Sequence, residues 1–391
     1  MKTSLTYPLA LGAIILYSSP TVLHADWLDR MDQQYEDTFQ KTDVAFDRAL
    51  KEGVKELDHE LADIWGEARN LPEPKVWVGY SKDRQTRIIV DYERGEMAIE
   101  GFNKSEDELR GEMQDILLED SQKLDERAIL RDRLIKKSKE FWRDQQTPTR
   151  ERVKATQDTK PRVINWRPRH ELSRLIEPKS QPVFVSRKAT FNTGKAGKIS
   201  RLSLNLRTDR DQVSAQSLAD PVSKMAKKYN LPRSLILSVI KNESAFNPRA
   251  RSHANALGLM QLVPTSGGKE AYSYLMGKDL TPGVDVLYDP YENIRLGATY
   301  LHLLNTRYFG KVKDEKARQY LIIAAYNTGA GNVAKAFTGK MKLRTAIRKI
   351  NRMSADQIFS HLRQHLPYDE TKTYLARVSK DTQTFADWDQ T

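Results

Sequence analysis

The sequence has no cysteine among its 391 residues. This absence excludes a disulfide framework, a thiolate metal site and a cysteine nucleophile, and thiol usage therefore says nothing about the redox compartment. We also expect no lipid-modified cysteine at the N-terminus. The stability of the fold has to come from the packing of its side chains.

Acidic residues are outnumbered by basic ones. The formal net charge is +12, and most of the excess lies between Arg150 and Arg210, where 16 Lys and Arg stand against 5 Asp and Glu, a local net charge of +11. This basic segment could lie along an anionic polymer, or it could be a solvated linker, which is the favoured interpretation. No recognised nucleic-acid motif occurs in its structural context, so we expect no nucleic-acid partner.

The apolar run at residues 9–16 is too short to span a bilayer. It follows the basic residue Lys2 and is followed by the small residue Ala25, a combination typical of a secretory signal over residues 1–25. We expect cleavage after Ala25. An uncleaved membrane anchor is the alternative.

Residues 26–210 are predicted to form an accessory α+β domain that includes the basic segment at 150–210. Apolar residues recur at steps of about three and four from Trp27 to Asn70, which predicts one or two amphipathic helices. Ser105 and Glu108 form a capping box that opens a charged helix reaching about Trp142. We find no sign of chemistry in these helices and strands.

Short β-rich runs separated by turn residues predict a small antiparallel meander in this accessory domain. The runs lie at 75–80, 87–92 and 96–100. Two later strand-like runs, at 182–186 and 199–206, could extend the same sheet.

From Asp220 onward the pattern changes to short helices, so residues 211–391 are predicted to form a compact α-rich domain. Asp220-Pro221 and Asp289-Pro290 each place a capping residue before a proline at the first helical position. Further helices are predicted to start at Pro264-Thr265 and, by a capping box with Gln357, at Ser354.

Residues 317–327 are apolar nearly all round, and a helix of that kind belongs at the centre of a domain. It ends at Thr328-Gly329-Ala330-Gly331. A final helix carries Tyr374, Leu375, Val378 and Phe385. The fold class predicted for the whole chain is α+β.

Glu243 is the candidate general acid. It follows Leu235 and Val239 at intervals of four, so one helical stripe carries aliphatic residues and then the carboxylate. Apolar surroundings disfavour the charged form and raise the pKa towards the working pH. Asn247-Pro248 is predicted to stop the helix. The alternative is a helix-end carboxylate that reaches solvent.

Three motifs follow one another in order. Glu243-Ser244 comes first, Gly258-Leu259-Met260-Gln261 ends 18 residues after Glu243, and the segment 324–331 has Asn327 84 residues after it. Together they resemble the lysozyme-like domain of the soluble lytic transglycosylases, which cleave bacterial peptidoglycan. The order of parts over nearly the whole mature chain resembles the membrane-bound lytic murein transglycosylase C family.

This resemblance implies one Glu that acts first as acid and then as base. Glu243 would protonate the bond between N-acetylmuramic acid and N-acetylglucosamine, and its carboxylate would then take a proton from the muramoyl C6 hydroxyl, which closes a 1,6-anhydro ring. Most glycosidases need a second carboxylate, and the residues reveal none close to the motifs. The family's single-Glu mechanism accounts for that.

The resemblance also assigns the remaining site residues. Glu243 matches the catalytic residue, and the substrate-binding residues that it implies are Ser244, Ser252, Met260, Gln261, Tyr326, Asn327 and Tyr374. For Met260, core packing is an equally good interpretation. Glu370 is a weaker candidate for a structural or cleft residue. No metal and no cofactor are expected.

Two alternatives to a lytic transglycosylase remain open from the sequence: a lysozyme-type hydrolase and a noncatalytic peptidoglycan-binding scaffold. The expected partner is the peptidoglycan glycan strand. The expected location is the periplasm, in a soluble or loosely attached form, with possible peripheral association with the outer membrane or with other cell-wall enzymes.

Overall fold

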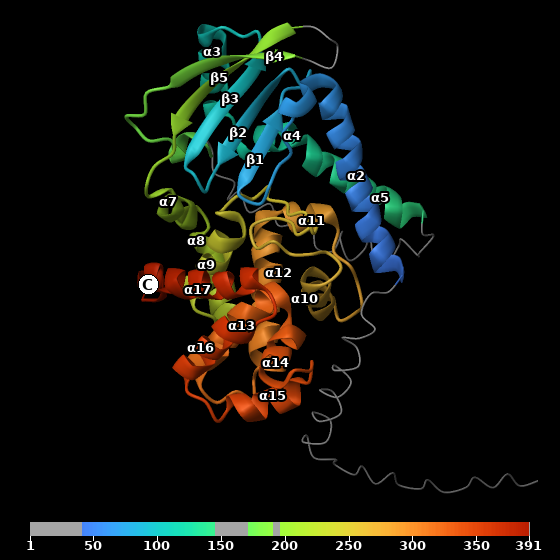
Figure 1. Ribbon diagram of the computed structural model, residues 1–391, viewed down its shortest axis with the longest axis vertical. Helices are drawn as coiled ribbons and strands as arrows, with labels where there is room; N and C mark the ends of the chain where they lie inside the picture. Colours follow the sequence, from blue (N-terminus) through green and yellow to red (C-terminus); the bar gives the residue numbers. More distant parts are fainter. Residues whose placement is uncertain (1–40, 145–170, 191–195, 391) are drawn as a thin grey trace, which may run out of the picture.

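The computed structural model describes residues 41–144, 171–190 and 196–390. It consists of an antiparallel sheet with its helices above a larger helical part (Figure 1). The predicted α+β class is thereby confirmed. The secretory signal, the start of the first predicted helix and much of the basic segment lie outside the described residues.

The sheet has five antiparallel strands in the order β1-β2-β3-β5-β4. The meander predicted from the three early β-rich runs is present, and the two later runs extend it through the pairing of β5 with β3. The strands are β1 (Val76–Tyr80), β2 (Thr86–Asp91), β3 (Glu96–Phe102), β4 (Val183–Thr190) and β5 (Ala196–Asn205).

The two faces of the sheet differ because side chains alternate along each strand. Trp77, Ile88 and Met97 point to one face and are buried with residues of α3 (Glu106–Leu118) and α4 (Ser121–Arg127). The other face contacts the end of α2 (Lys41–Trp65), which packs against α5 (Ile129–Asp144). It also carries charged residues, among them the buried Arg87–Glu100 pair.

The single charged helix predicted from Ser105 to Trp142 is wrong in extent. The capping box at Ser105 is present, but α3 ends at Leu118 and the chain forms α3, α4 and α5 in succession. Asp120 accepts a hydrogen bond from the backbone N–H of Lys123 and so begins a new helix. No glycine or proline marks this break, so the sequence pattern gave no sign that the helix ends there.

The helical part has helices α7 to α17, and α13 (Glu315–Thr328) lies among α14, α16 and α17. Its central position confirms the prediction from its apolar surface. The other elements are α7 (Arg210–Ser217), α8 (Ala219–Tyr229), α9 (Arg233–Ser244), α10 (Gly267–Met276), α11 (Val284–Tyr288), α12 (Pro290–Leu303), the π-helical turn η3 (Leu304–Tyr308), α14 (Ala330–Thr338), α15 (Leu343–Ile350), α16 (Ala355–His365) and α17 (Asp369–Thr384); short 3₁₀ turns are η1 (Gly66–Ala68), η2 (Ser173–Leu175) and η4 (Ala386–Asp389).

Two of the four predicted helix starts are confirmed. Asp289 caps α12 with Pro290 at the first position, and Ser354 caps α16 in a capping box. The cap predicted at Asp220 is wrong: α8 begins at Ala219, and Pro221 sits inside the first turn, where helices need no N–H donor. Similarly, α10 begins at Gly267, because a tight turn onto the Val263 carbonyl precedes it.

Arg249 joins the helical part to the sheet part. Its guanidinium donates to Asp125 at 2.7 Å and to Glu171 at 2.9 Å, and its side chain is only 3% exposed. A second contact, Lys269 to Asp43, links α10 to α2 at 2.9 Å. We propose a domain boundary near residue 210, where α7 begins, with 26–210 and 211–391 as the two units.

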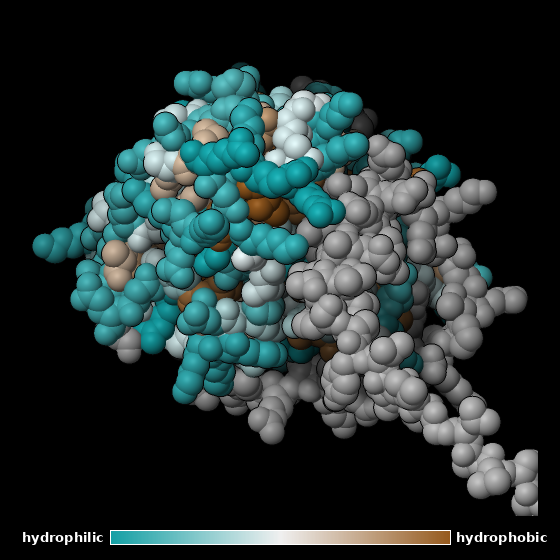
Figure 2. Space-filling view, turned by 90° about the horizontal axis from the view of Figure 1, so that it is seen from below, coloured by the Kyte–Doolittle hydropathy of each residue, from teal (hydrophilic) through white to brown (hydrophobic). Residues whose placement is uncertain are grey.

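Polar residues dominate the outer surface in Figure 2, as expected when the apolar residues form the core. Seen from below, the described surface is largely hydrophilic, and hydrophobic residues appear only in small separate groups (Figure 2). Within the described ranges, every helix is too short or too polar to cross a membrane.

Candidate active site

Helix α9 positions Glu243 as its second-last residue. Leu235 and Val239 of the same stripe are buried, so the stripe predicted from the sequence is the inward face of the helix. The predicted stop at Asn247-Pro248 is wrong, because α9 ends at Ser244. Ala245 adopts a left-handed conformation with φ of 49° and closes the helix by donating to the Lys241 carbonyl.

Glu243 lines a cleft between the sheet and the helical part with a volume of about 1490 Å³. The pKa of Glu243 is raised to about 8: burial raises it most, Tyr374 lowers it, the charge of Glu370 raises it, and the charge of Lys75 lowers it. Burial is the dominant cause, because the charged form loses water that the surroundings do not replace. Glu243 is therefore protonated at neutral pH and can deliver a proton.

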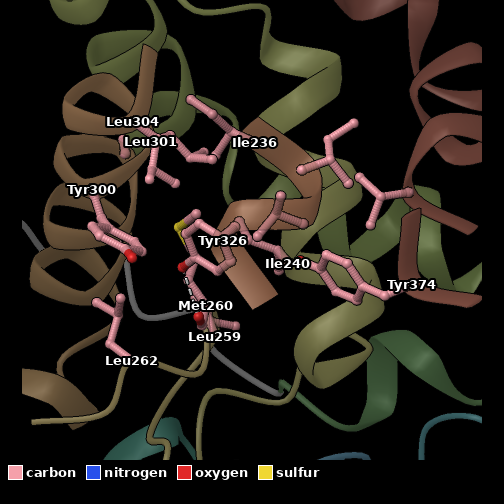
Figure 3. Packing of buried hydrophobic residues seen from close by; sticks show 14 of the residues in the cluster. Ile236, Ile240, Leu259, Met260, Leu262, Tyr300, Leu301, Leu304, Tyr326 and Tyr374 are labelled. Carbon is pink, nitrogen blue, oxygen red and sulfur yellow. Dashed lines mark hydrogen bonds between the residues drawn. The ribbon is translucent and has the colours of Figure 1, made fainter. Parts of the chain in front are cut away.

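Two tyrosines flank the acid. Tyr326, at the end of α13, is 9% exposed and donates a hydrogen bond to the Met260 carbonyl at 2.8 Å (Figure 3). Tyr374 of α17 is 8% exposed. Burial raises the pKa of both phenols well above the usual value, so both keep their hydroxyl protons.

The Tyr374 hydroxyl is buried and has no hydrogen-bond partner of standard geometry within the described part of the chain. It nevertheless lies close enough to Glu243 to favour the carboxylate. The contact between the Tyr374 hydroxyl and Glu243 is therefore longer or less well aligned than a full hydrogen bond. Such a hydroxyl can still tighten onto the carboxylate when the proton leaves.

Asn327 lies beside Tyr326 and also lines the cleft. Its side-chain oxygen accepts a hydrogen bond from the Thr371 hydroxyl at 2.7 Å, which fixes the orientation of the amide. The amide nitrogen makes no hydrogen bond to any described residue. An oriented donor of this kind can bind a carbonyl or hydroxyl of a ligand.

The loop after α9 supplies two more cleft residues, Ser252 and Gln261. The Gln261 side-chain nitrogen donates to the Gly258 carbonyl at 2.9 Å, and its side-chain oxygen is buried without a partner among the described residues. Gly258 has φ of +74°, and a Cβ there would lie 2.4 Å from the Leu287 carbonyl oxygen. Only glycine fits this turn.

Ser244 and Met260 are corrections to the predicted substrate-binding set. Both are 0% exposed. The Ser244 hydroxyl donates to the Leu259 carbonyl at 2.8 Å and so ties α9 to the loop. Met260 packs against Gly297 of α12, which decides between its two interpretations in favour of the core. Of the residues singled out from the sequence, those that line the cleft are Glu243, Ser252, Gln261, Tyr326, Asn327, Glu370 and Tyr374.

The sequence did not reveal several residues that shape this site. Asn293 of α12 accepts from the Met260 N–H at 2.7 Å and donates to the carbonyls of Leu257 and Leu287, which holds the loop in place. Lys75 of the sheet part and Arg377 of α17 reach the same cleft. Asn293 belongs to none of the three motifs, and the other two are far from Glu243 in the chain.

Metal-dependent chemistry has no visible donor set in the described ranges, where no group of three or more His, Asp or Glu side chains could hold a metal ion.

Two family models match the chain. The transglycosylase SLT domain matches residues 220–348, and the N-terminal domain of membrane-bound lytic murein transglycosylase C matches residues 43–126. A solved structure of lytic transglycosylase Slt from Pseudomonas aeruginosa is similar at 30% identity, covering 43% of this chain and 24% of that chain with a TM-score of 0.33.

Curated relatives match over most of the chain. Membrane-bound lytic murein transglycosylase C of Haemophilus ducreyi is 29% identical over 340 residues, which are 84% of this chain and 85% of the relative. The protein of that name from Cronobacter sakazakii is 31% identical over 326 residues, 82% of this chain and 85% of the relative. These matches confirm the resemblance predicted from the motifs, and the chain belongs to the membrane-bound lytic murein transglycosylase C family of enzymes.

Proposed function

We propose that the protein is a peptidoglycan lytic transglycosylase that cleaves the β-1,4 bond between N-acetylmuramic acid and N-acetylglucosamine and leaves a 1,6-anhydromuramoyl end. The observation that carries this proposal is the raised pKa of Glu243, about 8, on the wall of a cleft of about 1490 Å³. A cleft of that size accommodates several sugar units, and the acid is protonated where the bond would lie.

In the first step, protonated Glu243 transfers its proton to the glycosidic oxygen as the C1–O bond of the muramoyl residue breaks. Positive charge develops at C1 and its ring oxygen. The new carboxylate of Glu243 faces this charge in a poorly solvated place, where electrostatic attraction is stronger than in water. The Tyr374 hydroxyl is near enough to stabilise the carboxylate at this stage.

In the second step, the C6 hydroxyl oxygen of the same muramoyl residue forms a bond to C1, and its proton passes to the Glu243 carboxylate. This regenerates the acid and closes the 1,6-anhydro ring. A second carboxylate is not needed, because the nucleophile is part of the substrate and is already in place. Glu370 lines the cleft but is exposed, and we assign it no covalent role.

The other cleft residues are proposed to bind the sugars. Asn327 and Gln261 present polar groups that can pair with N-acetyl or hydroxyl groups, and Ser252 offers a hydroxyl. The Tyr326 hydroxyl is committed to the Met260 carbonyl, so we propose that it acts by holding the loop against the acid.

The product of digestion tests the reaction. We expect digests of purified sacculi to contain muropeptides with 1,6-anhydromuramoyl ends. Mass spectrometry recognises them because they lack one water and are therefore about 18 Da lighter than muropeptides with reducing ends. Reducing ends alone would establish the hydrolase alternative. Binding without any cleavage would establish the scaffold alternative.

Substitution of Glu243 tests its role. Glu243→Gln is expected to lower the turnover of sacculi by about 10²-fold to 10⁴-fold, the usual contribution of a general acid. Glu270→Gln is the matched control, because burial also raises the pKa of Glu270, which accepts a hydrogen bond from Tyr308 away from the cleft. Full activity in Glu243→Gln would remove the catalytic assignment.

We further propose that the protein works in the periplasm, in association with the cell envelope, where its substrate lies. The relatives are named membrane-bound. Cell fractionation tests this: release of the protein from membranes by high salt would support a peripheral attachment, and release only by detergent would support an anchor.

A further inference from the structure

We propose that Lys75, Arg94 and Arg377 form a carboxylate-binding subsite beside Glu243, and that this subsite binds a carboxylate of the peptide stem carried by the muramoyl residue. The inference rests on the proposed function, because it concerns the substrate of the same cleft. Its basis is the place in the cleft where Lys75 and Arg94 of the sheet part meet Arg377 of α17.

Lys75 is held at the cleft by the loop that follows α9, called here the catalytic loop. The side-chain nitrogen of Asn247, a fully buried residue just after α9, donates to the Pro74 carbonyl at 3.1 Å. The segment that precedes β1 is thereby fixed against the loop that follows Glu243. Lys75 lines the cleft, and its ammonium contacts the Glu93 carboxylate at 2.6 Å.

Glu93 marks the place where three cations converge. Its pKa is lowered first by the hydrogen bond from Lys75, with further contributions from the charges of Lys75, Arg377 and Arg94. The Arg94 side chain is 85% exposed, and its guanidinium contacts the Asp91 carboxylate at 3.7 Å. One turn beyond Tyr374, Arg377 is exposed and makes no hydrogen bond or ion pair to any residue in the described ranges.

Around Glu93, positive charge is thus in excess of negative charge. Three cations face the two carboxylates Glu93 and Asp91, and all five residues line the cleft. Glu93 is itself 61% exposed, so it can be displaced by a carboxylate from solvent. No ion pair joins these three cations to the other carboxylates of the lining, which are Glu67, Glu73, Glu96, Glu100, Glu243, Asp369 and Glu370.

The chemistry of the substrate selects the partner. The lactyl carboxyl of a muramoyl residue is neutral while it forms the amide bond to its peptide stem, so a stem-bearing glycan strand offers carboxylates to these cations only on the stems. A carboxylate is the group that arginine and lysine bind best. Because Lys75 and Arg377 flank the cleft beside Glu243 and Tyr374, the stem concerned is the one near the bond to be cleaved.

The test uses the full chain and three substrates at low salt: native sacculi, sacculi whose stem carboxylates have been converted to neutral amides, and glycan strands stripped of peptide, which retain only a lactyl carboxylate. We expect Arg377→Gln to raise KM on native sacculi about fivefold, the upper range for an exposed ion pair, with kcat unchanged. The amidated substrate should show the same loss with the wild-type enzyme and no further loss with the variant.

Lys380→Gln is the matched control, since Lys380 is an exposed cation on α17, one turn from Arg377, that does not line the cleft. It should leave KM unchanged on every substrate. An effect of Arg377→Gln confined to stripped strands would assign the lactyl carboxylate instead and overturn the stem assignment. Equal losses on native and amidated sacculi, or none on native sacculi, would overturn the subsite. Failure of the wild-type enzyme to form anhydromuramoyl ends would overturn the proposed function separately.

Discussion

At the scale of single residues, the site depends on how water is withheld from a few polar groups. Glu243 keeps its proton because its surroundings do not solvate the carboxylate. The nearby Tyr374 hydroxyl makes no full hydrogen bond to any described residue. Ser244, the neighbour of Glu243 in sequence, points the other way and serves the fold. Two adjacent residues of one motif therefore have different roles: we propose a chemical one for Glu243, and Ser244 has a structural one.

The pH dependence of activity follows from the raised pKa of Glu243. Because the acid form is required, kcat/KM for peptidoglycan should be level below about pH 7 and should fall as the pH rises through about 8. Initial rates on soluble glycan strands across this range measure it. A fall centred near pH 4.5, the ordinary value for the carboxyl, would contradict the assignment.

The same pKa predicts a pH dependence of stability. Between pH 4.5 and about 8 the folded state binds the Glu243 proton more tightly than the unfolded chain does. This contribution to stability is fully present below the unfolded pKa and is lost as the pH rises through the folded pKa. The melting temperature of Glu243→Gln minus that of the wild type should therefore increase from pH 5 to pH 8. A constant difference would contradict it.

The buried serine also makes a testable prediction. Ser244→Ala leaves the Leu259 carbonyl without its donor and should lower the free energy of unfolding by about 1–2 kcal/mol. Ser379→Ala, which removes a buried hydroxyl that has no partner in the described ranges, should change stability little. Thermal melts measure both. Equal effects would show that the Ser244 hydrogen bond contributes nothing special.

At the scale of elements, α12 holds the loop that carries the Gly-Leu-Met-Gln motif. Asn293 binds the backbone on both sides of Gly258, and Met260 packs onto Gly297 one turn later. The loop itself has only two isolated β-bridges, Arg251 with Leu257 and Leu257 with Leu262, to support it. Its shape, and with it the position of Gln261 in the cleft, is imposed by a helix that begins after it in the chain.

Gly297→Ala tests this packing. A Cβ at Gly297 would lie 2.2 Å from the Met260 sulfur, so we expect a loss of about 1–3 kcal/mol of stability, although alanine favours a helix by about 1 kcal/mol. Gly111→Ala in α3 is the control, because nothing lies within 4 Å of its Cβ. It should raise the melting temperature slightly. Opposite signs for the two variants are the expected outcome, and stabilisation by both would contradict the close approach.

At the scale of the whole molecule, the cleft exists because the sheet part and the helical part are locked together. Arg249 follows Glu243 by only a few residues and is buried against Asp125 and Glu171 of the sheet part. One residue of the catalytic loop thus fixes the wall that faces it. The accessory part, predicted to have no chemistry of its own, supplies Lys75 and much of the cleft lining.

Arg249→Met tests this connection. Removing one partner of a buried ion pair leaves uncompensated carboxylates and should lower stability by about 3–5 kcal/mol. Arg207→Met is the control, since Arg207 pairs with Asp209 at the surface, where such a pair contributes at most about 1 kcal/mol. Calorimetric melts compare them. Similar small losses would mean that the two parts hold together without Arg249.

The sequence by itself determined the fold class, the central helix 317–327 and the sheet, and it singled out Glu243 as the candidate acid, because these depend on local periodicity, turn residues and motifs that can be read along the chain. It could not separate Ser244 from Glu243, or place Met260 in the core, because those outcomes depend on which side of α9 meets the loop and which side of the loop meets α12. Only the tertiary structure decided that Lys75 and Arg377 share a cleft with Glu243, since residues far apart in the chain are brought together by packing and by the buried Arg249 contacts.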